Sequence, residues 1–494
     1  MKRLLYTTLL ISLLTGTTAV DADELKRCRV AVTKANTQAA KCVGAGLARG
    51  LRGKKSDSSY CEERLVARYE KAAKRLRCGE ECRSACGAQA ENANAVIEQL
   101  QETLAFSGFL STGSFEIVAE GLDSPRGLSC APEGDSSLVY VAEAGRGGST
   151  ENEFYIAADG RPAFLGQSGA VGRVQSDLSY ERILTGLPSS AAADQTGGFL
   201  DANGPNDVIF LGPGEMAVVM GLASNLSVRE TLQTPGAEKL GTLLDASGEI
   251  IADLARFEGE RNSDGRLIPT GCGLMTFSDD YTSNPFRGRG GDKALIVDPG
   301  ANAVLAVDDS GQIEVVAADF PDQIQPMPDL SVFFPAGQSL CPPQGPGLPP
   351  AGPMPSQSVP TSLACPSEDG IDGCVVGELT GLPFTLGSAR IYNLSPGEPE
   401  YTIAASGFTT IVDTALDDQG TLFVLEYARG GLPEIFGMTP PQGGLYRIDQ
   451  GLKTQLDGGK LTAPNGLAVC NGYLYVSDLT QVAGEGRILR MALP

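Results

Sequence analysis

The stretch APNGLAVCNGYLYVSD, residues 463–478, contains the unit on which the fold prediction depends. A short apolar strand follows a proline, and a second apolar strand then ends in an acidic residue. Segments like the first strand recur along the chain, at 124–130, 204–210, 270–276, 359–365, 410–416 and 463–469. Such regular recurrence indicates a repeat architecture rather than one unrepeated sheet.

The second strand of the unit recurs as well. Five copies end in an acid, at 139–143, 294–298, 374–378, 422–426 and 474–478, whereas the copy at 217–221 ends in Gly221. A third strand and usually a fourth follow, but the last unit has no fourth strand. The stretch FEIVAEGL at 115–122 supplies one, which is how a propeller closes and removes its exposed edges. The sequence therefore predicts an all-β six-bladed β-propeller over residues 108–494, with N-terminal strand closure.

Two further segments precede this propeller. Residues 1–22 have the pattern of a signal peptide, because Lys2 and Arg3 are followed by a short apolar run. Residues 23–107 are rich in Ala, Lys, Arg, Glu and Leu at helical spacing, which predicts a small disulfide-rich α-helical module. No later segment is continuously apolar enough for a transmembrane helix. We therefore expect a protein that is secreted or periplasmic.

The 12 cysteines support export, since disulfides form in oxidising compartments. Six lie before residue 108, and we expect three disulfides among them, with the pairing open. In the propeller, Cys365 is expected to pair with either Cys374 or Cys341. Cys130 and Cys470 occupy equivalent positions in the first and last units, where either a disulfide or two buried thiols would fit.

Composition excludes several kinds of function. The net charge is −22, and the predicted propeller carries 48 acidic against 20 basic side chains, which argues against binding nucleic acid or an anionic membrane. The chain has no His and no Trp. Ser-His-Asp triads, His-ligated zinc and His-based acid–base catalysis are therefore excluded.

Several long motifs resemble the ScyD/ScyE family of NHL-like propeller proteins. They are GLDSPRGL, YVAEAGRGG, QSVPTSLAC, VVGELTGLPF, GSARIYNL, GFTTIVDTALDDQGTLFVLE and APNGLAV with LYVSD. The resemblance covers about residues 115–494 and implies a six-bladed propeller. That family is associated with scytonemin biosynthesis in cyanobacteria. The resemblance implies the fold more strongly than any one reaction.

The repeat aligns two rings of candidate residues. The first ring follows the proline position of the inner strand and faces the central channel. This ring contains Arg126, Asn206, Cys272, Thr361, Val412 and Asn465, and Asp207 and Asp413 lie one position further on. The predicted ligand-binding residues are Arg126, Asn206, Asp207, Thr361, Asp413 and Asn465. The second ring consists of the strand-end acids Glu143, Asp298, Glu378, Glu426 and Asp478. Carboxylates of this kind suit Ca²⁺, but they also commonly accept backbone N–H bonds in turns, so both a metal site and a structural role are open.

These features favour a binding or scaffold protein over an enzyme. Its partner would be a small molecule, a glycan or a protein, and we expect a monomer. The alternative is a divalent-metal-dependent hydrolase that uses the central channel, because the PND around Asn206 and the PNG around Asn465 resemble metal-ligand positions of gluconolactonase-type propellers. A quinone-cofactor dehydrogenase is a third and weaker hypothesis.

Overall fold

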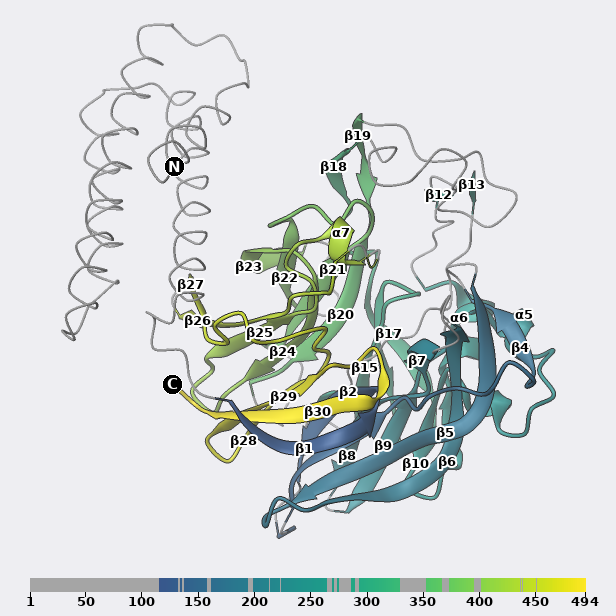
Figure 1. Ribbon diagram of the computed structural model, residues 1–494. Helices are drawn as coiled ribbons and strands as arrows, with labels where there is room; N and C mark the ends of the chain where they lie inside the picture. The colour runs from purple at the N-terminus through teal and green to yellow at the C-terminus, as the bar shows by residue number, and fades with distance from the viewer. Residues whose placement is uncertain are drawn as a thin grey trace, which may run out of the picture. The chain divides into compact units, whose positions relative to one another are not determined.

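Six antiparallel sheets, each built on four strands, follow one another along the chain and form the blades of a β-propeller in the computed structural model (Figure 1). The structure describes residues 115–494 except 132–133, 136, 158–160, 194–198, 213, 223, 264–268, 271–272, 275–285, 289–292, 329–351, 367–372, 395–400, 436, 438 and 450. The predicted signal peptide, 1–22, and the predicted helical module, 23–107, lie outside the described residues. The predicted six-bladed propeller is confirmed.

In every blade the chain runs from the innermost strand outward. The first blade contains β2 (Pro125–Cys130), β3 (Ser137–Glu143), β5 (Pro162–Gln175) and β6 (Tyr180–Ala193), and two short strands from its connections extend the same sheet. The second contains β8 (Pro205–Gly212), β9 (Glu215–Met220), β10 (Thr242–Asp245) and β11 (Ile250–Asp253). The third contains β14 (Phe286–Gly288), β15 (Lys293–Asp298), β16 (Ala303–Val307) and β17 (Ile313–Ala318).

The last three blades follow the same plan. The fourth contains β20 (Ser358–Ala364), β21 (Val375–Thr380), β22 (Ala389–Asn393) and β23 (Thr402–Phe408). The fifth contains β24 (Ile411–Leu416), β25 (Leu422–Glu426), β26 (Gly444–Asp449) and β27 (Leu452–Gln455). The sixth contains β28 (Leu467–Cys470), β29 (Tyr473–Asp478) and β30 (Ala483–Ala492), and is completed by β1 (Glu116–Asp123).

The N-terminal strand closes the ring as predicted. β1 pairs antiparallel with β30, and the two strands lie side by side although they come from opposite ends of the propeller sequence (Figure 1). Val118 and Leu122 of β1 are buried in the core, and Glu116 accepts a 2.7 Å bond from Arg490 of β30. The outer edge of the last blade is thereby covered by a paired strand.

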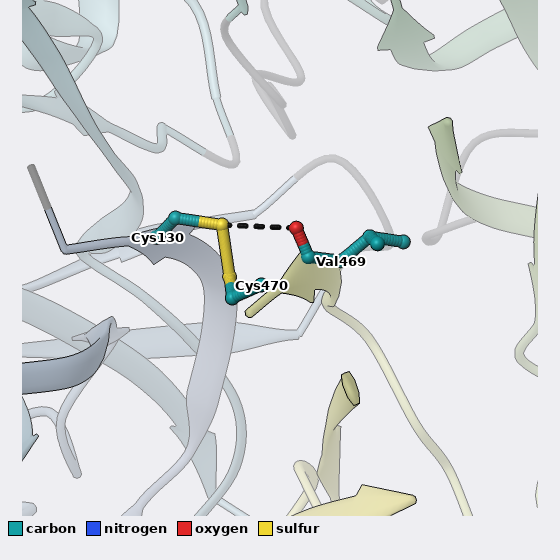
Figure 2. The surroundings of a disulfide bond; sticks show 3 residues. All are labelled: Cys130, Val469 and Cys470. Atoms are coloured by element: carbon teal, nitrogen blue, oxygen red, sulfur yellow. Dashed lines mark hydrogen bonds between the residues drawn. A yellow bond between two sulfur atoms is a disulfide. The ribbon is translucent and has the colours of Figure 1, made fainter. Parts of the chain in front are cut away.

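A disulfide adds a covalent closure between the first and last blades. Cys130 at the end of β2 is bonded to Cys470 at the end of β28, 340 residues further along the chain (Figure 2). The Cys130 Sγ also lies 3.1 Å from the Val469 carbonyl oxygen. A second disulfide joins Cys365 to Cys374, which settles the alternative that the sequence left open for Cys365.

The core lies between adjacent blades rather than in one central mass. Val139 and Val141 of the first blade pack in one cluster with Ala468 and Tyr475 of the last. These side chains come from strands whose alternate residues face opposite sides of the sheet, so each blade contributes to two such clusters. In the described part of the chain, no helix has the length and apolar character of a transmembrane span.

The third blade differs from the sequence prediction. Its innermost strand is β14 and not the segment 270–276, where the structure has the short hairpin of β12 (Pro269–Thr270) and β13 (Gly273–Leu274). That segment lacks the proline of the repeat and contains two glycines, which pack poorly in strands. β14 also ends close to β15 in sequence, as a hairpin partner should. Cys272 lies outside the described residues.

The longer connections gather on one face of the propeller. In a four-stranded antiparallel blade, the connections from second to third strand, and from one blade to the next, leave from the face at which the innermost strands begin. We call this the loop face. Its connections contain β4 (Phe154–Ile156), β7 (Phe199–Asn203), α5 (Leu226–Arg229), the 3₁₀ turn Ala237–Lys239, α6 (Leu254–Arg261), β12, β13, β18 (Gln323–Met327), β19 (Gly352–Ser356) and α7 (Leu432–Ile435).

The opposite face carries tight turns. In five of them an Asp side chain accepts a hydrogen bond from the backbone N–H two residues further on, which is the Asx pattern that stabilises a compact turn. The aspartates are Asp135, Asp177, Asp245, Asp308 and Asp417. The two faces therefore differ in kind, and the loop face offers the more varied surface for a ligand.

Candidate functional site

The strand-end acids make hydrogen bonds within the propeller at the loop face. Three of them accept a hydrogen bond from a backbone N–H group just before the innermost strand of their blade. In each case the donor residue lies three positions before the first-ring residue. The pairs are Glu143 with Asp123 (2.6 Å), Glu426 with Thr409, and Asp478 with Thr462 (2.7 Å). The second blade, which has Gly221 instead of an acid, makes a backbone bond from Gly221 to Gly204. The recurring contact therefore joins the end of the second strand to the start of the first.

The other two acids also have partners within their own part of the fold. Glu378 accepts bonds from the hydroxyl of Ser358, the hydroxyl of Tyr392 (3.0 Å) and the side-chain amide of Gln323 (2.8 Å). Asp298 accepts bonds from the backbone N–H groups of residues 300 and 301, at 3.0 and 3.1 Å. All five acidic side chains of the ring are buried.

These contacts favour the structural interpretation of the acidic ring. Arg182 donates two bonds to Glu143, at 2.6 and 2.7 Å, and Arg487 donates two to Asp478, at 2.9 and 2.6 Å. Burial raises the pKa of Asp478 despite its Arg487 partner. Within the described residues, no three His, Cys, Asp or Glu side chains are grouped so that they could hold a metal ion. The described contacts of the five acids are thus with protein donors, as the structural interpretation expects.

Two first-ring residues contribute to contacts between strands. The Thr361 hydroxyl donates a 2.7 Å bond to the carbonyl of Ile411 and so joins the fourth blade to the fifth. The backbone N–H of Asn465 donates to the carbonyl of Ser477 in its own blade, at 3.1 Å. Asn206 lies on β8 and is buried. Thr361 has a sufficient structural role, so its place in the ring does not require a ligand.

Asp207 and Asp413 are buried carboxyl groups that lie within electrostatic range of each other. They lie on the innermost strands of the second and fifth blades, which are opposite members of a six-blade ring, and each is only 1% exposed. Asp413 accepts backbone bonds from Thr414 (2.7 Å) and from Leu467 of the sixth blade (2.6 Å). Burial, and then the negative charge of Asp413, raises the pKa of Asp207 well above its usual range. The protonated form of Asp207 is therefore favoured.

The Asp207 carboxyl group is also packed tightly. It accepts a bond from the backbone N–H of Val208 at 2.8 Å. A methyl group at Gly127 of the first blade would lie only 2.1 Å from its Oδ1 atom. Glycine is therefore required at 127, because the inner strand of the first blade directly contacts this side chain.

Arg126 differs from the other first-ring residues because its charged group lacks a full set of partners. Its Nη2 donates a 2.8 Å bond to the carbonyl of Ala202, in the strand β7 that precedes the second blade. Its Nε is buried and has no hydrogen-bond partner among the residues that the structure describes. Burial lowers the pKa of Arg126, while Asp201 and Tyr427 raise it, so both groups lie within electrostatic range of the guanidinium.

Tyr427 and Asp201 complete this cluster, and neither was predicted from the sequence. Tyr427 directly follows the strand-end acid of the fifth blade, and its pKa is raised by burial and by the charge of Asp201. Asp201 has a positive φ of 52° and forms a 2.8 Å ion pair with Arg161. The repeat position after each strand-end acid is the sequence signal that could have identified Tyr427. We call Arg126, Asp201 and Tyr427 the channel-mouth cluster.

Comparison with known proteins adds no assignment of activity. No family model and no curated protein matches the chain. Among solved structures, a putative gluconolactonase is 10% identical over 78% of this chain and 95% of its own, with a TM-score of 0.38. A gluconolactonase from Xanthomonas campestris is 10% identical over 78% and 99%, with a TM-score of 0.35. The PQQ-bound aldose sugar dehydrogenase of Streptomyces coelicolor is 14% identical over 78% and 99%, with a TM-score of 0.34.

Proposed function

We propose that the protein is an exported β-propeller of the ScyD/ScyE type that binds a ligand on its loop face. The observation that carries the proposal is Arg126, because a partly buried guanidinium with one protein partner is expected to use its other donors on something else. The channel-mouth cluster around it draws on three separate parts of the ring. Such convergence is typical of a binding site rather than of a contact that stabilises one blade.

Export is supported by the disulfides. Cys130–Cys470 and Cys365–Cys374 would be stable in a secreted or periplasmic protein, whereas cytosolic thiols are normally kept reduced. The signal-like pattern of residues 1–22 supports the same location. Mass spectrometry of protein collected from the medium or periplasm should find a mature N-terminus near residue 23 and both disulfides formed.

The metal-dependent hydrolase is the competing function. It needs a bound divalent ion, and its ligands would include Asn206 and Asn465. Elemental analysis of the purified protein, together with a lactone and ester panel, separates the two proposals. A stoichiometric divalent ion with turnover that is lost in an Asn206→Ala variant would favour the hydrolase.

A thermal-shift screen tests the binding proposal. Sugars, organic acids, peptides and divalent ions are added to the wild-type protein, to Arg126→Gln and to the control Arg173→Gln. Arg173 lies on β5 near the opposite face and pairs with Glu181 on the exposed surface, so its loss should leave binding unchanged. At least one compound should raise the melting temperature of the wild type and of the control, and raise it less in Arg126→Gln. If every compound that stabilises the wild type stabilises Arg126→Gln equally, the loop-face proposal is wrong.

A further inference from the structure

The unused groups of the channel mouth can all donate hydrogen bonds. Beyond the bond of its Nη2 to Ala202, the Arg126 guanidinium makes no other hydrogen bond to a described residue, and its Nε is buried. No hydrogen bond joins the Tyr427 hydroxyl to another residue in the described part of the chain. A buried N–H donor without an acceptor is costly, so a group that supplies acceptor oxygens is favoured at this place. A metal ion has no use for such donors.

The donors come from two blades and are electrostatically coupled. Arg126 lies on the innermost strand of the first blade, and Tyr427 follows β25 of the fifth. Burial and Asp201 raise the pKa of Tyr427 while the Arg126 charge lowers it, so the two side chains lie within electrostatic range of each other. A ligand that contacts both side chains would therefore connect the first blade to the fifth.

The surrounding charges limit the ligand to a single negative charge. Asp201 forms an ion pair with Arg161 but still acts electrostatically on Arg126 and Tyr427. Glu434, which also acts on Tyr427, accepts backbone bonds from residues 430 and 442. This leaves the positive charge of Arg126 available, with carboxylates around it. A dianion such as a phosphate monoester would be repelled by those carboxylates. A planar carboxylate matches the guanidinium fork and carries one charge.

We infer that the loop face binds a small organic molecule through one carboxylate group, which accepts hydrogen bonds from Arg126 and Tyr427. This inference rests on the proposed function and deepens it, because it names the class of ligand. It also assigns a role to Tyr427. The tyrosine is a donor to the ligand and not part of the propeller core.

The test compares molecules that differ only in the charged group. Benzoate is paired with benzamide and gluconate with gluconamide, and binding to each is measured by isothermal titration calorimetry. A carboxylate should bind more tightly than its neutral partner. Loss of a charge-assisted bond should weaken carboxylate binding roughly 10- to 100-fold in Arg126→Gln, and by a smaller factor in Tyr427→Phe. Arg173→Gln should bind as the wild type does, and circular dichroism should show that every variant is folded.

The outcomes distinguish the inference from the proposed function. If neutral molecules bind as tightly as their carboxylate partners, or if Arg126→Gln and Tyr427→Phe bind carboxylates at full strength, the carboxylate inference is wrong. If the screen finds neutral ligands that need Arg126 while no carboxylate binds, the inference fails and the loop-face function stands. If no compound of any class depends on Arg126, both fail.

Discussion

Removal of the disulfide between the first and last blades should destabilise the protein far more than removal of the local one. The perturbation is Cys130→Ala with Cys470→Ala, and the matched control is Cys365→Ala with Cys374→Ala. The first bond closes 340 residues and the second closes 9. The chain-entropy relation gives about 5.8 kcal/mol for the longer loop and about 2.6 kcal/mol for the shorter one at 25 °C.

The comparison of the two variants is more informative than either value alone. Each variant removes two sulfur atoms, so the losses of packing largely cancel. The difference between the two free energies of unfolding then measures the difference in loop-closure entropy of the denatured chain. That difference is expected to be about 3 kcal/mol. Equilibrium unfolding in guanidinium chloride, followed by tyrosine fluorescence and circular dichroism, measures the free energy of unfolding of both variants and of the wild type.

Two results would contradict this reasoning. Equal losses in the two variants would mean that the pairing of β1 with β30 already restrains the ends of the chain, even in the unfolded ensemble. A larger loss for the Cys365–Cys374 variant would mean that local geometry outweighs chain entropy. A lower slope of free energy against denaturant than in the wild type would also count against it, because loss of a cross-link should expand the denatured state and raise the slope.

Three further predictions concern single side chains. Burial and Asp413 raise the pKa of Asp207 in the folded chain above its unfolded value of about 3.9, so the folded state keeps a proton that the unfolded state releases. The free energy of unfolding should therefore fall as the pH rises from about 4 through the folded pKa. Denaturant titrations across this pH range should show a smaller fall for Asp207→Asn than for the wild type. An unchanged pH profile in the variant would refute the assignment. Glu143→Gln should lower the free energy of unfolding by about 2 kcal/mol, because it removes the buried negative charge that pairs with the partly solvent-exposed Arg182. A thermal melt indistinguishable from that of the wild type would exclude the structural role. Val118→Asp should bury a charge beneath β1, detach this strand and expose the edge of β30. Light scattering should then detect aggregates of the variant, whereas the wild type is expected to be monomeric. A monomeric variant of normal stability would show that β1 is dispensable.

The repeat could be predicted from the sequence because it is written in short apolar strands with prolines and acids at fixed places. The missing fourth strand of the last unit made the closure by residues 115–122 predictable, and β1 confirms it. The equivalent positions of Cys130 and Cys470 indicated that a bond was possible. They could not decide it, because a disulfide needs two specific side-chain positions that only the ring geometry provides.

The third blade and the channel mouth could not be predicted in the same way. β14 is short and a long insertion precedes it, so the segment at 270–276 matches the repeat better than the true inner strand does. Asp201 lies in a loop-face connection, which has no repeat to align, and Tyr427 can be aligned only as the residue that follows a strand-end acid. Arg126 can be identified because it lies in the register of the inner strand, but its partners come from other blades and become visible only in three dimensions. Alignment of the repeats predicts where a residue lies within its own blade. It does not predict which residues of other blades it contacts.

Hydrogen–deuterium exchange tests most directly whether the ligand is held at the channel mouth. The strongest-binding carboxylate of the panel is added to the wild-type protein, and backbone protection is mapped along the propeller. Slower exchange should be confined to loop-face segments around residues 123–127, 200–206 and 427–435. Protection that appears instead in the turns of the opposite face, around residues 176–179, 245–249 and 417–421, would contradict the account.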